Sequence, residues 1–329
     1  MNSSPTRIFG ILVLLLLSIS VTAQNSRFEP SDTLNKKRLR TAYIGAGVIY
    51  TTFSVGLWNA WYKQYPISGF HTFNDWDEWE KMDKAGHFMG TYLETRYLFE
   101  GARWTGMDRN RARWTAAGGA LLLQTTVEVM DGFSEQWGWS WYDVGFNVGG
   151  AAFYFAQDAA WQEQRMLMKI SNSFPRYPET PVFSIDGGAT TTLANRAETL
   201  YAGGVFGQFL KDYNGQTIWM SVNPRSFTAD PQHSKLPPWL NIAVGYGAEN
   251  MYGGFANRWS EGGAVFTTDP TQYPRYKQLF LSFDVDLSRI PTKNRALKAL
   301  LSTLNFIKIP APTLEYNRVD GLRGHWIYF

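Results

Sequence analysis

Polar residues at helical spacing in three neighbouring stretches constrain the fold of this chain more than any other feature. In the first stretch, residues 82–102, the segment "MDKAGHFMGTYLETRY" places Asp83, His87, Gly90 and Glu94 at steps of four, three and four. With 3.6 residues per turn, these steps put all four on one face of a helix whose other faces are apolar or small.

The next two stretches, 110–130 and 140–169, repeat the pattern. The second stripe consists of Gln124, Glu128 and Asp131, and the third consists of Asp143, Asn147, Gly150 and Tyr154, with Ser140 beside them. An ionised group without a partner in an apolar medium is strongly unfavourable. We therefore expect the stripes to face one another and to form one polar network. Lys84 points a quarter-turn away from the first stripe and is expected to snorkel or to pair with an acid on a neighbouring helix.

The N-terminal sequence indicates export. Arg7 precedes the apolar run "ILVLLLLSISV", and "VTA" follows it with the small residues that a signal peptidase accepts. We predict a removed signal peptide at 1–23 and a linker at 24–41. Residues 42–62 carry no charge and, as a helix, would reach roughly 30 Å, so they either span or enter a membrane or form a buried core helix.

The fold class expected from these patterns is α+β. Residues 42–170 are predicted to form a membrane-associated bundle of about four helices with a polar core, and 171–329 a β-rich domain. Strand-like alternation is clearest in "LFLSFDVDLS", where apolar residues take one face and Ser or Asp the other. A basic amphipathic helix is predicted near 293–306, which either covers one face of the sheet or lies on a membrane surface.

The amino-acid composition excludes some classes of partner and binding site and favours a location at a membrane. The net charge is only +3, which with the export signal argues against nucleic acid. The absence of cysteine excludes disulfides and thiolate metal sites. Aromatic residues make up 16% of the chain, and Trp and Tyr favour membrane–water boundaries. We therefore expect membrane lipid as a partner, with an envelope protein complex as a second possibility, at the outer membrane or its periplasmic face rather than the inner membrane.

The stripes also permit a site. His87 with Glu128 and Asp143 offers one nitrogen and two oxygen ligands, or a general base oriented by an acid. The spacing matches no established metal motif, so no metal and no cofactor are assigned. Catalysis by these three on an envelope lipid or glycan remains one hypothesis. A second is a structural network that fixes helix register in a scaffold or partner subunit. A third is a ligand-binding gap at Gly90 and Gly150.

Several of these segments resemble known families. "DKAGH" at 83–87, Glu128, "DGFS" at 131–134 and "SWYDVGFNVGG" at 140–150 resemble the YfiM-like predicted periplasmic lipoproteins, in the long form of Bacteroidetes-type bacteria, and more distantly the VanZ-like membrane proteins. The resemblance implies an envelope protein with a helical core and no established activity. The lipobox cysteine is missing, so lipid anchoring does not carry over from the family.

Overall fold

The structure is a computed structural model that describes residues 29–63, 65–201 and 204–329. The predicted signal peptide at 1–23 lies outside these residues. The described chain divides into two compact units. The first takes in the described residues up to Trp76, Lys84–Gln164 and Thr292–Leu300, and the second takes in Asp77–Asp83, Arg165–Pro291 and Leu301–Phe329.

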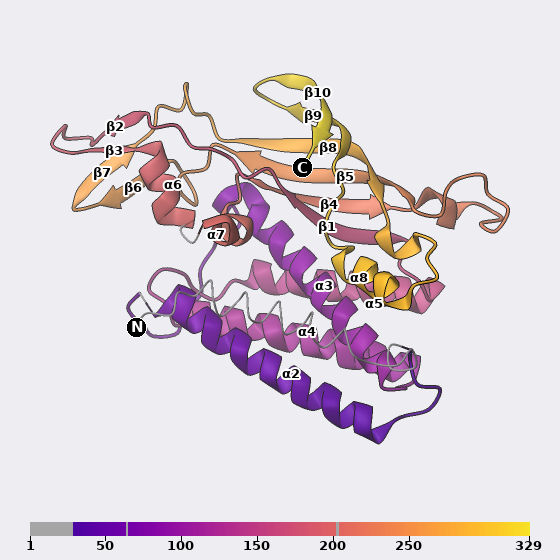
Figure 1. The fold of residues 1–329 in the computed structure, drawn as a ribbon. Coiled ribbons are helices and arrows are strands. Elements are labelled where there is room, and N and C mark those ends of the chain that lie inside the picture. Colours follow the sequence, from indigo (N-terminus) through magenta and orange to yellow (C-terminus); the bar gives the residue numbers. More distant parts are fainter. Residues whose placement is uncertain (1–28, 64, 202–203) are drawn as a thin grey trace. The chain divides into compact units, whose positions relative to one another are not determined.

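Four long helices make up most of the first unit (Figure 1). They are α2 (Lys36–Leu57), which continues as a π-helical turn (Trp58–Tyr62), α3 (Met82–Trp104), α4 (Arg109–Gly132) and α5 (Trp141–Trp161). Three of them begin at capping residues whose side chains accept hydrogen bonds from the first turn: Asn35, Asp108 and Ser140. The second stretch expected from the sequence therefore begins one residue early, at Arg109.

The helices of the first unit pack closely through small residues. The buried face of α4 includes Ala112, Ala116 and Ala120. A Cβ atom at Gly150 of α5 would overlap the backbone oxygen of Phe88 in α3. Because only glycine allows this approach, the polar stripes of α3 and α5 are brought within hydrogen-bonding reach.

The expectation for residues 42–62 needs correction. No helix among the described residues is long and apolar enough to cross a membrane, so the spanning alternative is wrong for α2. Its many Gly, Thr and Ser residues hold its mean hydropathy down. The core-helix alternative is also wrong, because α2 contains no buried residue and exposes Tyr43, Ile44 and Val48.

The third helical stretch is shorter than expected. Helix α5 ends at Trp161, where Gln162 adopts a left-handed conformation with φ of 55°. Residues that the sequence prediction placed in the same helix instead form the first strand, β1 (Met166–Asn172). Such a left-handed residue commonly ends a helix, but a glutamine there gives no sequence signal for it.

The second unit is built on a six-stranded antiparallel sheet in the order β1-β4-β5-β8-β9-β10 (Figure 1). Its further strands are β4 (Gln216–Val222), β5 (Leu240–Glu249), β8 (Tyr276–Val285), β9 (Ala311–Asn317) and β10 (Gly321–Tyr328). Helix α8 (Arg295–Leu304) matches the amphipathic helix expected near 293–306. With α6 (Leu193–Tyr201) and α7 (Gly204–Lys211), the described residues hold seven α-helices in all. The fold is thus α+β, with long helices in the N-terminal half and a large antiparallel sheet in the C-terminal region.

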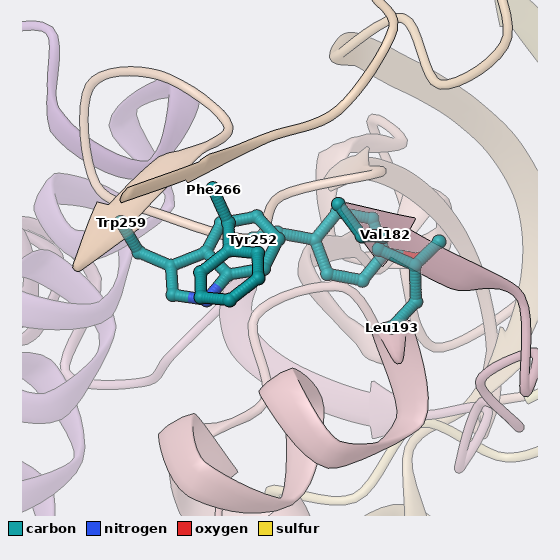
Figure 2. Packing of buried hydrophobic residues seen from close by; sticks show 5 residues of the cluster. All are labelled: Val182, Leu193, Tyr252, Trp259 and Phe266. Carbon is teal, nitrogen blue, oxygen red and sulfur yellow. The ribbon is translucent and has the colours of Figure 1, made fainter. Parts of the chain in front are cut away.

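Two short hairpins form a separate small core in the second unit. They are β2 (Pro181–Phe183) with β3 (Thr190–Thr192), and β6 (Arg258–Glu261) with β7 (Ala264–Thr267). Figure 2 shows their buried side chains together with Leu193 of α6 and the loop residue Tyr252: Val182, Leu193, Tyr252, Trp259 and Phe266. The rings of Trp259 and Phe266 stack at 5.7 Å between centroids. This cluster gives the hairpins a hydrophobic anchor of their own.

Candidate functional site

A buried lysine lies at the centre of the first unit's polar network. Lys84, in the first turn of α3, places its Nζ 2.7 Å from Asp75 Oδ2 and 2.6 Å from Asp143 Oδ1. Its side chain is only 1% exposed. Ser140, the N-cap of α5, donates to Asp75 Oδ1 at 2.6 Å and accepts from the backbone N–H of Asp143 at 3.1 Å. The connector before α3, the start of α3 and the start of α5 are thereby joined.

The Lys84 ammonium stabilises the charged form of Asp75. Burial, the largest influence, raises the pKa of Asp75. The interaction with Asp143, the hydrogen bonds donated by Lys84 and Ser140, and the charge of Lys84 outweigh burial, so the pKa lies below its usual value. A buried charge is tolerated only when paired and hydrogen-bonded. The cluster meets that condition.

His87, one turn further along α3, joins α3 to α4 and α5. Its Nδ1 lies 3.1 Å from Asn147 Oδ1 and 3.6 Å from Glu128 Oε1, and its Nε2 lies 3.8 Å from Asp143 Oδ2. Asn147 Oδ1 also accepts from Thr91 Oγ1 at 2.8 Å, while Asn147 Nδ2 donates to Glu128 at 3.4 Å. Because Asn147 Oδ1 is an acceptor here, the Nδ1 of His87 is the protonated nitrogen that donates to it.

Glu94 and Gln124 form a second, smaller polar contact between α3 and α4. Gln124 Nε2 donates to Glu94 Oε1 at 2.8 Å. The other oxygen, Glu94 Oε2, is buried and has no hydrogen-bond partner in the part of the chain that the structure describes. Burial raises the pKa of Glu94 to about 7, against the opposing effects of the Gln124 hydrogen bond and the charge of His87. This carboxyl group therefore changes its charge near neutral pH.

Two of the expected residues also have hydrogen-bond partners outside the network. Asp131, at the end of α4, accepts a hydrogen bond from Tyr62 Oη at 2.7 Å. Asp83 belongs to the stretch Asp77–Asp83 of the second unit, where Tyr213 Oη donates to it at 3.0 Å. Helical spacing predicts which face of a helix a side chain occupies, but it does not predict which residue of a neighbouring segment the side chain contacts.

Sequence reasoning missed two members of the network. Asp75 lies in the connector before α3, outside the three helical stripes, yet at 5% exposure it is a core residue. Thr91 lies one turn after His87 on the same helix face, so the step of four could have revealed it. A further buried ion pair, in which Asp158 of α5 binds Arg109 and Arg113 of α4, was also not foreseen.

The arrangement limits what chemistry the cluster can perform. Asp143 and Glu128 are 4% and 1% exposed, and only His87 has a side chain appreciably open to solvent, at 15%. Asp143 Oδ1 is already engaged by the Lys84 ammonium, which competes with any metal cation for the same oxygen. Of these three side chains, His87 is the one that a group from outside could reach.

Comparison of the chain with known protein families finds one match. The family described as "Predicted periplasmic lipoprotein (DUF2279)" matches residues 73–157, a span that contains Asp75, Lys84, His87, Glu128 and Asp143. No curated protein and no solved structure matches the chain. Over this helical segment the chain is thus similar to predicted periplasmic lipoproteins, which supports an exported, envelope-associated protein of unknown role.

Proposed function

We propose that this protein is a scaffold or partner subunit of a protein complex in the outer envelope, at the outer membrane or its periplasmic face. In this proposal the polar network of the first unit, Asp75, Lys84, His87, Thr91, Glu128, Ser140, Asp143 and Asn147, is structural. It fixes the register of α3, α4 and α5, as buried hydrogen-bonded networks do when all their members have partners.

One observation carries the proposal: the network's side chains use their polar atoms on one another. Lys84 binds two aspartates, and Asn147 is shared by His87, Thr91 and Glu128. Binding a substrate would require breaking several of these contacts at once. A closed network of this kind suits a rigid frame better than a reaction centre.

The proposal is tested by replacing His87 with alanine and comparing protein abundance with the envelope phenotype of a deletion strain, such as detergent sensitivity. Loss of hydrogen bonds to a buried partner should lower stability by about 2 kcal/mol, or a midpoint shift of about 4–8 °C for a unit of this size. Abundance should then fall while detergent sensitivity rises. His233, which is 86% exposed, is the matched control, and its change to alanine should alter neither.

An opposite outcome would favour a reaction centre. If His87→Ala or Glu128→Gln reproduced the detergent sensitivity of the deletion strain while abundance and thermal midpoint stayed at the wild-type level, the scaffold role would be wrong. The second candidate function would then apply: binding or modification of an envelope lipid or glycan by His87 with Glu128 and Asp143. The partial exposure of His87 is the observation that favours it.

A further inference from the structure

The large sheet of the second unit is inverted relative to an ordinary water-facing sheet. Along β8, polar Gln278, Ser282 and Asp284 are buried, whereas Leu279, Leu281 and Phe283 are 53%, 50% and 55% exposed. Ordinarily the apolar face of an antiparallel sheet packs on a core and the polar face meets water. Here the apolar face points outward.

The buried face combines paired polar groups with a small apolar cluster of Trp219, Ala243 and Phe280. Lys169 of β1 has no exposed surface and places its Nζ 2.8 Å from Asp284 Oδ2 and 2.7 Å from the backbone oxygen of Val285. Ser221 of β4 donates to the same Asp284 Oδ2 at 2.6 Å. At the far end of the sheet, the ring of Tyr328 lies 4.6 Å from that of Phe280. These contacts fix which face is inside.

The exposed face extends over neighbouring strands in register. Phe283 of β8 lies opposite Ile242 of β5, and Leu281 lies opposite both Val244 of β5 and Leu314 of β9. We call this the outer face: Met220, Ile242, Val244, Leu279, Leu281, Phe283, Leu314, Tyr316 and Leu322, all at least 37% exposed. Not one of these residues carries a charge.

The size of the outer face marks it as an interaction surface. At about 4.8 Å between strands and 3.3 Å per residue, its backbone positions from β4 to β10 cover roughly 19 by 13 Å before side chains are added. Contiguous apolar patches larger than a few hundred Å² are rare on soluble monomers, and the largest patch is often functional.

A groove of about 480 Å³ lies within this face, between β8, β9 and β10. Its lining includes Leu281, Phe283, Leu314, Gly324 and Trp326. Gly324 pairs with Leu314 across the strands, and a Cβ atom at Gly324 would meet nothing within 4 Å. The missing side chain opens the groove, and Trp326, 89% exposed, borders it. The volume lies in the range of small-molecule sites.

The charges around the outer face indicate the kind of partner. Lys277 precedes Leu279 by two residues on the same side of β8, and its Nζ lies 3.9 Å from Glu80 Oε2. Arg318 begins the turn after β9, and both basic residues are exposed. The uncharged apolar surface suits the hydrocarbon layer of a bilayer, and the exposed Trp and Tyr beside it suit the membrane–water interface. The basic residues at one end suit anionic headgroups. A protein partner would more often find polar groups distributed around the rim.

We propose that the outer face binds the surface of an anionic membrane leaflet, with one lipid acyl chain in the groove and lipid phosphates near Lys277 and Arg318. The proposal concerns the second unit alone and does not depend on the role of the polar network.

Vesicle flotation of the purified chain tests this. With vesicles of phosphatidylethanolamine and phosphatidylglycerol, the chain should float, and with phosphatidylcholine alone it should float less. Leu281→Glu should weaken binding about tenfold or more, the equivalent of losing the burial of one leucine. The matched control is Phe183→Glu, since Phe183 is 66% exposed but lies on β2, away from the outer face; its binding should equal that of the wild type. Circular dichroism checks the fold of each variant.

Gly324→Phe tests the groove itself. A phenylalanine there should fill the groove, exclude the acyl chain and reduce flotation. If the outer face bound the membrane without an acyl chain in the groove, the added aromatic ring would instead strengthen binding. Unchanged or stronger binding would refute the acyl-chain site. Equal loss with Phe183→Glu and Leu281→Glu would refute the outer face as the membrane contact. If the chain does not float but sedimentation shows a dimer that Leu281→Glu dissociates, the occupant is a second copy and the proposal is wrong.

Discussion

Replacing Lys84 with methionine should destabilise the protein more than any surface charge change. Methionine keeps most of the side chain's volume but removes the ammonium group. Asp75 and Asp143 then face each other without a cation, each in a buried position. Breaking a buried ion pair by removing one partner typically destabilises a protein by about 3–5 kcal/mol. Since whole domains are stable by about 5–15 kcal/mol, we expect about a third of that stability to be lost.

The stability lost in Lys84→Met should depend on pH, and the pKa values of the two carboxyl groups decide whether it grows or shrinks as pH rises. In the wild type the pKa of Asp75 is below 3.8, so its stabilising contribution is present above that pH and is lost only in stronger acid. Without Lys84, burial raises the pKa of both carboxyl groups above the unfolded value. A raised pKa favours folding at low pH and disfavours it as pH rises. The deficit of Lys84→Met should therefore be smaller at pH 5 than at pH 8.

Urea denaturation of the full chain at the two pH values measures this effect. The matched control is Lys81→Met, because Lys81 lies 3.7 Å from Asp77 in an exposed pair that should contribute at most about 1 kcal/mol. Adding Asp75→Asn and Asp143→Asn to Lys84→Met should recover most of the lost stability. A deficit below about 1 kcal/mol that is equal at both pH values would refute the buried ion-pair argument.

Two further predictions concern the helices of the first unit. Burial raises the pKa of Glu94 from 4.5 to about 7, so the protein should lose stability as pH rises through that range. At 1.36 kcal/mol per pKa unit, the loss should be about 3 kcal/mol. Glu94→Gln should remove this pH dependence from denaturation curves measured at pH 5 and pH 8. A wild-type curve that is flat over this range would contradict the shift. Gly150→Ala should destabilise the protein by more than about 2 kcal/mol because its Cβ would overlap Phe88, whereas Gly145→Ala in the same helix meets nothing within 4 Å and should stabilise it by up to about 1 kcal/mol. Equal thermal midpoints for these two variants would rule out the close approach of α3 and α5.

The sequence allowed the helices and their polar faces to be predicted because helical periodicity is a local property. The positions of His87, Glu128, Asp143 and Asn147 follow from steps of three and four alone. Their partners do not, since the contact of Lys84 with Asp75 depends on how the connector before α3 folds back. Local spacing sets the face, while the tertiary path decides which groups meet.

Residues 42–62 show a different limit of sequence reasoning. An uncharged run of helical length has the same pattern in a membrane span, a core helix and an exposed helix. Among the described residues no helix is long and apolar enough to cross a membrane, and α2 contains no buried residue. A Cβ atom at Gly45, Gly47 or Gly56 of α2 would meet nothing within 4 Å, so no close helix contact requires a glycine there. Small residues permit close packing but do not require it.

The alternation in β8 shows why the function of a sheet face cannot be read from hydrophobicity alone. A strand pattern separates Leu279, Leu281 and Phe283 from Ser282 and Asp284, but it does not say which set lies inside. If water is the solvent, the leucines belong inside. The buried Lys169–Asp284 pair reverses that answer, because an ion pair with no exposed surface must lie on the enclosed face. The apolar residues are then left outside, and an exposed face of that composition is stable where its own surroundings are apolar.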